Sequence, residues 1–170
     1  MTTVEFEAAV LENKDRVYNY ARGILRDPEE AKDVTQESLI RLWRHRERVV
    51  AGPGCRSWLF RSTHNLCVDR LRRRSTSLEA GRDEGNGDST DHRPGPERLT
   101  SSAEVASCLE RALMNLDDRD RAIVLLREVE GLPYDEIAAA LGLKMGTLKA
   151  TLHRAREKLR HALIRAEVTP

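Results

Sequence analysis

Apolar side chains recur at helical spacing along the beginning of the chain. Phe6, Val10, Val17, Ala21 and Ile24 follow one another at steps of four, seven, four and three residues. Such steps place these side chains on one face of a helix with 3.6 residues per turn. The pattern therefore predicts a long first helix that buries this face.

A helix boundary follows at the sequence Asp27-Pro28-Glu29-Glu30. Aspartate is a preferred N-cap, proline suits the first helical position, and acidic residues suit the first turn. We therefore expect a second helix to begin here. Its apolar side would carry Val34, Leu39, Leu42 and Trp43.

A third helix is predicted after the loop at 51–54, which consists mainly of glycine and proline. Leu59, Leu66 and Leu71 would lie on one side of this helix. Arg61, Asn65 and Arg72 would lie together on the other side. The first half of the chain is thus predicted to be helical throughout.

The composition changes between residues 75 and 101, which are rich in Gly, Asp, Ser and Pro. With so little apolar surface to bury, this segment cannot offset the loss of chain entropy, and we predict a flexible acidic linker. Helical spacing returns afterwards, and a cap is expected at Asp117 or Asp118. The apolar positions there are Val105, Leu109, Ala112, Leu113, Leu116, Ala122, Leu125, Leu126 and Val129. The predicted fold is all-α, with two small helical domains at 1–74 and 102–170.

A helix-turn-helix is predicted between Gly131 and Leu159. A short helix would turn Ile137, Ala138 and Leu141 inward, and Gly142 would end it. A longer helix would then bury Leu148, Leu152, Ala155 and Leu159. Its remaining surface carries Lys149, His153, Arg154, Arg156, Lys158 and Arg160. A cationic helix of this kind can enter the major groove of duplex DNA.

Charge is distributed unevenly, although the 170-residue chain has a formal net charge of only +1. Six arginines face one aspartate between Cys55 and Arg74, whereas five acids face one arginine between Asp83 and Glu97. Two basic blocks thus flank an acidic connector, a distribution that favours nucleic-acid contacts. No apolar run approaches the length of a membrane span, so we expect a cytoplasmic protein without membrane insertion.

The sequence offers little support for a metal site, a cofactor or an enzyme. Cys55, Cys67 and Cys108 are odd in number and widely spaced, which argues against a disulfide framework. A zinc site at Cys55, His64 and Cys67 would lack a Cys-x-x-Cys pair and a fourth ligand, so buried thiols are the simpler interpretation. Redox control through Cys55 or Cys67 is a further hypothesis. No phosphate loop, HExxH or Ser/His/Asp arrangement is present, and no catalytic site, metal or cofactor is expected.

Three segments together resemble the extracytoplasmic-function group of bacterial RNA polymerase sigma factors, which is group four of the sigma-70 family. They read DPEEAKDVTQESLIRLWRH from residue 27, CRSWLFRSTHNLCVDRLRRR from residue 55, and LMNLDDRDRAIVLLREVEGLPYDEIAAALGLKMGTLKATLHRAR from residue 113. The resemblance implies that residues 1–74 are sigma region 2 and residues 102–170 are region 4. It implies three partners: core RNA polymerase, promoter DNA and an anti-sigma factor.

The resemblance also assigns functional residues. Those expected to bind the polymerase are Asp33, Gln36, Glu37, Ile40, Arg41 and Arg44. Those expected to bind the melted minus-10 element are Arg56, Trp58, Arg61, Asn65, Arg72 and Arg73. Cations for the backbone and planar side chains for the bases are what single-stranded DNA requires, and Phe60 is a second possible platform.

For the minus-35 element, the matching positions are Thr147, Lys149, Ala150, Thr151, His153 and Arg154. Many relatives carry a serine and then an arginine where this chain has Ala150 and Thr151. A lost base contact of that kind costs about 1–3 kcal/mol. We therefore expect weak duplex affinity or a shifted sequence preference.

A conventional transcriptional regulator, with a helical sensor domain before the helix-turn-helix, explains the second half of the chain equally well. It leaves the segment from Trp58 to Arg74 and the second helix without a purpose. The two classes differ in one property, because a regulator binds duplex DNA by itself and a sigma factor does so poorly without core polymerase.

Overall fold

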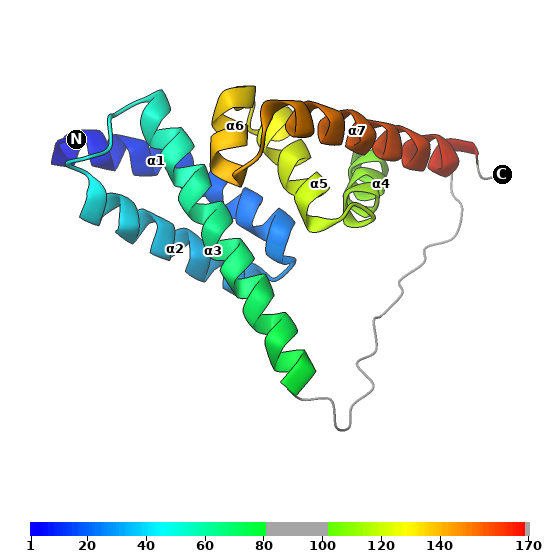
Figure 1. Cartoon of the computed structure of the whole chain (residues 1–170), viewed down its shortest axis with the longest axis horizontal. Helices are drawn as coiled ribbons and strands as arrows, with labels where there is room; N and C mark the ends of the chain where they lie inside the picture. The colour runs from blue at the N-terminus through cyan, green and yellow to red at the C-terminus, as the bar shows by residue number, and fades with distance from the viewer. Residues whose placement is uncertain (81–101, 169–170) are drawn as a thin grey trace.

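The computed structural model describes residues 1–80 and 102–168, and every regular element in these ranges is helical (Figure 1). The first range contains α1 (Thr3–Leu25), α2 (Pro28–His45) and α3 (Pro53–Ala80). The second contains α4 (Ser102–Met114), α5 (Asp118–Val124), the π-helical turn η1 (Leu125–Val129), α6 (Tyr134–Leu141) and α7 (Met145–Val168). Residues 75–80 of the predicted linker continue α3, and 81–101 lie outside the described residues.

The predicted caps at Asp27 and Asp117 and the predicted break at Gly142 are confirmed. Asp27 Oδ1 accepts hydrogen bonds from the backbone N–H groups of Glu29 and Glu30 at 2.9 and 3.0 Å. Asp117 caps α5 by accepting from Asp120 N at 2.8 Å. Gly142 ends α6 with φ at 65°, a left-handed conformation that glycine adopts without steric cost.

The first domain is a three-helix bundle in which α1 packs against both α2 and α3. Val17, Ala21, Leu42 and Leu59 are completely buried at its centre. Thr63 ties two helices together, because its hydroxyl lies 3.0 Å from Ser38 Oγ and donates to Leu59 O at 2.8 Å. These contacts fix which face of α3 points outward.

The helix-turn-helix of the second domain is formed by α6 and α7, which α5 supports from behind. Ile137, Leu148 and Ala155 are completely buried and Leu152 nearly so, as the apolar spacing predicted. The π-helical turn after α5 was not predicted. It brings Leu125 and Leu126 into the buried core.

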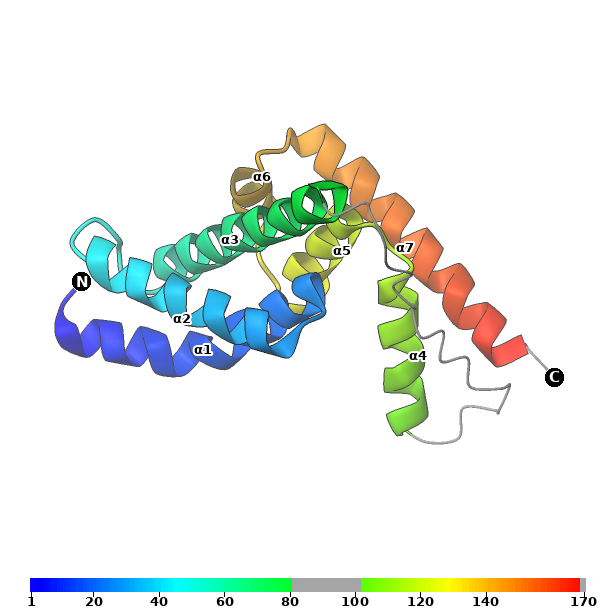
Figure 2. The same ribbon diagram turned by 90° about the horizontal axis from the view of Figure 1, so that it is seen from below.

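The two domains pack directly against each other. Helix α6 lies along α3, and α5 and η1 meet α1 (Figures 1 and 2). The two domains approach each other closely at Gly23, where an added Cβ would lie only 2.7 Å from Leu125 Cδ1. The linker hypothesis did not predict this contact.

Candidate nucleic-acid and protein interfaces

The predicted polymerase-binding residues gather on the exposed side of α2. A groove of about 390 Å³ separates this side from α3, and Asp33, Gln36, Glu37, Ile40 and Arg41 line it. Across the groove lie Leu66, Asp69, Arg70 and Arg73 of α3. The remaining predicted residue, Arg44, is exposed near the end of α2. The side chain of Ile40 is apolar and 38% exposed, which makes it a candidate contact for a protein partner.

The mixed charge of this face is organised by an ion pair one turn apart. Arg41 Nε donates to Glu37 Oε1 at 2.9 Å, and both side chains remain substantially exposed. Trp43 lies at the end of α2, where the guanidinium of Arg46 stacks 4.0 Å above its ring and Phe6 packs edge-on. Trp43 thus supports the α2 end while keeping part of its ring exposed.

The predicted minus-10 residues divide into two groups. Arg61, Asn65, Arg72 and Arg73 are exposed on α3, and the first three share a stripe because they are four and seven residues apart. Arg72 Nη2 donates to Asp69 Oδ1 at 3.1 Å. Along this stripe, Arg61 lies before the Asn65 amide and Arg72 lies after it. The predicted placement of these three side chains on one face is confirmed.

Arg56 and Trp58 form the other group at the start of α3, where both are half-buried. The ring of Trp58 lies 5.8 Å from the imidazole of His45, between centroids. Phe60 is completely buried and packs edge-on against Tyr20. The expectation that Phe60 is a second platform for bases is therefore wrong, because its ring belongs to the core.

Arg56 faces the second domain. Its guanidinium donates to the backbone carbonyl of Glu130, and the neighbouring Ser57 hydroxyl donates to the Glu136 carboxylate. Arg16 of α1 also reaches Glu130, donating from Nε to Oε2 at 2.8 Å and from Nη2 to the carbonyl at 3.1 Å. Burial raises the pKa of Glu130, although Arg16 and Arg56 act in the opposite direction.

Arg74, the last arginine of the basic run, has a structural position. It donates to Leu25 O at 3.1 Å and pairs with Asp27 and Glu30 at 3.2 and 2.7 Å. These contacts tie α3 to the turn between α1 and α2. Nothing in the sequence distinguished Arg74 from its neighbours Arg72 and Arg73.

The predicted minus-35 residues lie at the start of α7. Thr147, Lys149, Ala150, His153 and Arg154 are exposed there, whereas Thr151 is only 2% exposed and accepts a hydrogen bond from Arg154 Nη2 at 3.3 Å. Cations further along α7 are paired with acids. The pairs are Arg156 with Glu128, Lys158 with Asp120, and Arg160 with Glu157. Lys149 and Arg154 are thus the exposed cations among the predicted minus-35 residues, apart from His153.

The buried polar groups of the first domain do not form a metal centre. His64 Nδ1 lies 2.9 Å from the Tyr20 hydroxyl, and burial lowers the pKa of His64 to about 4. Burial raises the pKa of Cys67 to about 12 and also raises that of Cys55, so both remain protonated thiols at neutral pH. Within 1–80 and 102–168, no group of three or more His, Cys, Asp or Glu side chains could hold a metal ion.

Comparison with known proteins accounts for both domains. The Sigma-70 region 2 family matches residues 9–76, and the Sigma-70 region 4 family matches 106–159. The ECF RNA polymerase sigma factor SigL of Mycobacterium tuberculosis is 34% identical over 160 residues, which cover 90% of this chain and 85% of SigL. The chain belongs to the ECF RNA polymerase sigma factors. The regulator alternative is not favoured, because the region 2 match accounts for the half of the chain that it left unexplained.

Two further comparisons extend this result. The ECF sigma factor SigE of Mycolicibacterium smegmatis is 35% identical over 158 residues, 93% of this chain, but the chain spans only 61% of the length of SigE. The sigma factor RpoE of Bartonella quintana, solved in complex with the anti-sigma factor NepR, shares the fold. Its TM-score is 0.76 at 22% identity, over 93% of this chain and 96% of RpoE. Across the described residues, no helix is both long and apolar enough to cross a membrane.

Proposed function

We propose that this sigma factor docks on core RNA polymerase through α2, reads the melted minus-10 element with α3, and reads the minus-35 duplex with α7. The observation that carries the proposal is the Arg61, Asn65 and Arg72 stripe on α3. These polar side chains are exposed on the outer face of a helix whose other side forms the domain core. They are therefore available for a partner and are not needed for folding.

Docking is proposed at the groove between α2 and α3. Its lining combines an exposed isoleucine with negatively charged carboxylates and positively charged guanidinium groups. Such a face suits a charged helical partner, since the apolar contact supplies affinity and the charges set the register. We propose that this partner is the coiled-coil clamp of the polymerase's largest subunit.

Strand holding is proposed for the outer stripe of α3. Arginines can neutralise backbone phosphates, and the Asn65 amide can make a bidentate contact with a base edge. Trp58 is half-buried beside His45, so part of its ring can receive an unstacked base. The protein would stabilise an open strand by binding alone, with no catalytic group of its own.

Duplex reading is proposed for the first turns of α7. Lys149 and Arg154 can contact phosphates or bases, and Thr147, Ala150 and His153 can face base edges. Thr151 would act indirectly in this arrangement, because its buried hydroxyl accepts a hydrogen bond from Arg154. Relatives with arginine at this position would present a different surface.

Control by an anti-sigma factor is proposed by analogy with RpoE of Bartonella quintana, which was solved with such a partner. Core polymerase works in the cytoplasm, and we propose that this chain acts there.

The assignment of α3 is tested by Asn65→Ala, with Lys14→Ala on the exposed side of α1 as the matched control. A lost bidentate contact of about 1–3 kcal/mol should reduce promoter opening by roughly fivefold to 150-fold. Opening is measured by permanganate reactivity of unpaired thymines, and binding to core polymerase is measured separately. Unchanged opening would contradict the assignment, and an equal loss of core binding would show that Asn65 acts in folding or docking.

A further inference from the structure

Helix α3 exposes one large apolar side chain among the polar residues proposed to hold the melted strand. Val68 is 44% exposed, and among the described residues of α3 it is the only large apolar side chain that is exposed. It follows Asn65 by three residues and precedes Arg72 by four, so it lies on the same face as the Arg61, Asn65 and Arg72 stripe. The stripe therefore contains an apolar position between its amide and its last cation.

The local structure of α3 does not require a valine at this position. The core of the first domain is filled from the inner side of the helix, where Leu59, Phe60 and Cys67 are completely buried. Valine also has a lower helix propensity than alanine, because its β-branched side chain loses rotamer freedom in a helix. The exposed part of Val68 thus serves neither the core nor the helix, and it is available for contact with a partner.

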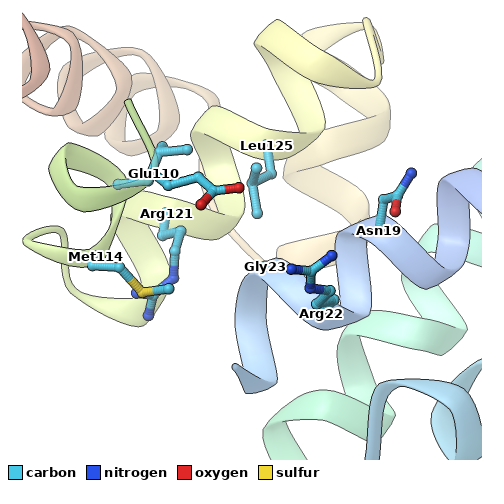
Figure 3. Close-up of a pocket in the computed structure, with 8 residues that line it drawn as sticks. Asn19, Arg22, Gly23, Glu110, Met114, Arg121 and Leu125 are labelled. Carbon is cyan, nitrogen blue, oxygen red and sulfur yellow. The ribbon is translucent and has the colours of Figure 1, made fainter. Parts of the chain in front are cut away.

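The surroundings of Val68 continue the stripe. Val68 and Arg72 both line a hollow of about 580 Å³, which Leu141 and Leu143 of the second domain also line. The hollow drawn in Figure 3 is a different one, because its walls come from α1 and from the second domain, with Arg22 and Glu110 on opposite sides and no lining residue from α3. The accessible surface of Val68 is therefore continuous with the guanidinium end of the stripe.

We propose that Val68 is a specificity contact for the melted strand, and that it recognises the 5-methyl group of a thymine. This inference rests on the proposed function of α3 in strand binding. The 5-methyl group of thymine is the apolar group on the base edges of DNA, and an apolar side chain favours it because both surfaces leave water on contact. Residues three apart on a helix have Cβ atoms about 5–6 Å from each other. The thymine would therefore be next to the base held by Asn65.

The test begins with a selection by the protein bound to core RNA polymerase. The probe is short single-stranded DNA of random sequence, and the bound molecules are recovered and sequenced. Each thymine of a selected sequence is then replaced in turn by deoxyuridine, which lacks only the 5-methyl group. We expect one thymine, beside the base whose recognition requires Asn65, at which the replacement weakens binding about fourfold, the effect of burying one methyl group.

The variant Val68→Ala shows whether Val68 makes this methyl contact. It should bind the thymine and deoxyuridine forms with affinities that agree within about 1.5-fold, because the two changes remove the same contact and are not additive. The matched control is Val4→Ala, since Val4 is 74% exposed on α1, outside the stripe. Val4→Ala should keep the fourfold difference. A merely structural role of Val68 would weaken binding of both forms equally and leave the difference between them unchanged.

Two results would overturn the assignment of Val68 without touching the function of α3. One is a fourfold difference that persists in Val68→Ala. The other is a selected sequence whose binding requires Asn65 but in which no thymine is sensitive to loss of its methyl group. A pool that yields no selected sequence, or one that Asn65→Ala binds equally well, would instead refute strand binding by α3 and the inference with it.

Discussion

At the scale of single residues, His64 couples the stability of the first domain to pH. Burial lowers its pKa to about 4, so the imidazole is neutral in the folded protein. The Tyr20 hydroxyl, whose own pKa is raised by burial, stays protonated and can donate to the unprotonated Nδ1. Cys67 lies near Tyr20, and Arg72, Asp118 and Arg119 line the hollow beside His64.

The unfolding free energy should therefore fall as the pH drops from about 6.5 toward 4. Between these values the unfolded chain binds a proton at His64 and the folded chain does not, so stability is lost at up to about 1.4 kcal/mol per pH unit. Urea unfolding at several pH values measures the slope. His64→Gln should have a shallower slope over this range, and an identical slope in both proteins would contradict the prediction.

Arg73 and Arg74 are adjacent but should behave differently when each is changed to glutamine. Arg74 bonds to Leu25, Asp27 and Glu30, whereas Arg73 is exposed beside the α2–α3 groove. Because Arg74 is partly exposed, its loss should cost only about 1 kcal/mol, a fall in Tm of roughly 3 °C. Arg73→Gln should leave Tm unchanged and weaken promoter opening. Equal Tm values for the two variants would refute the distinction.

The sequence predicted individual residues well where the signal was local. The cap at Asp27 and the break at Gly142 each depend on backbone geometry within a few residues. The sequence analysis gave Phe60 as a possible platform for bases and Thr151 as a DNA contact, and both side chains are buried. Their burial depends on which neighbours the fold brings to each side of the helix. Phe60 meets Tyr20 of α1, and Thr151 faces inward on α7.

At the scale of elements, α7 combines an exposed start, which we propose reads DNA, with a later part whose cations pair with acidic residues. Lys149 is exposed at its start, whereas Arg160 further along pairs with Glu157 at 2.7 Å. The apolar period of the sequence predicted the helix and its buried side. The apolar period could not show which cations of α7 pair with acidic residues, because pairing depends on which carboxylates the fold brings near them.

The two cations should therefore differ in the salt dependence of DNA binding. Lys149→Ala should lower the slope of log affinity against log salt concentration by about one, the value for one phosphate contact, and Arg160→Ala should leave it nearly unchanged. The measurement is a salt titration of promoter binding by the complex with core polymerase. Equal slopes for both variants would show that the start of α7 does not contact DNA.

At the scale of the whole molecule, the sequence predicted two helical domains but not their contact. The apolar patterns report burial within each domain, whereas the interface combines the packing of α6 on α3 with polar bonds, a close approach at Gly23 and hollows. No periodic pattern encodes such a surface. The composition of 75–101 predicted a flexible linker, and such a composition carries no information about whether the two domains touch.

Transcription by purified core RNA polymerase, with and without this protein, on pooled bacterial promoter fragments tests the central claim most directly. The account predicts defined transcripts only when the protein is added, and their aligned start sites should share two upstream elements. No transcripts, together with failure of the protein to co-elute with core enzyme, would contradict it.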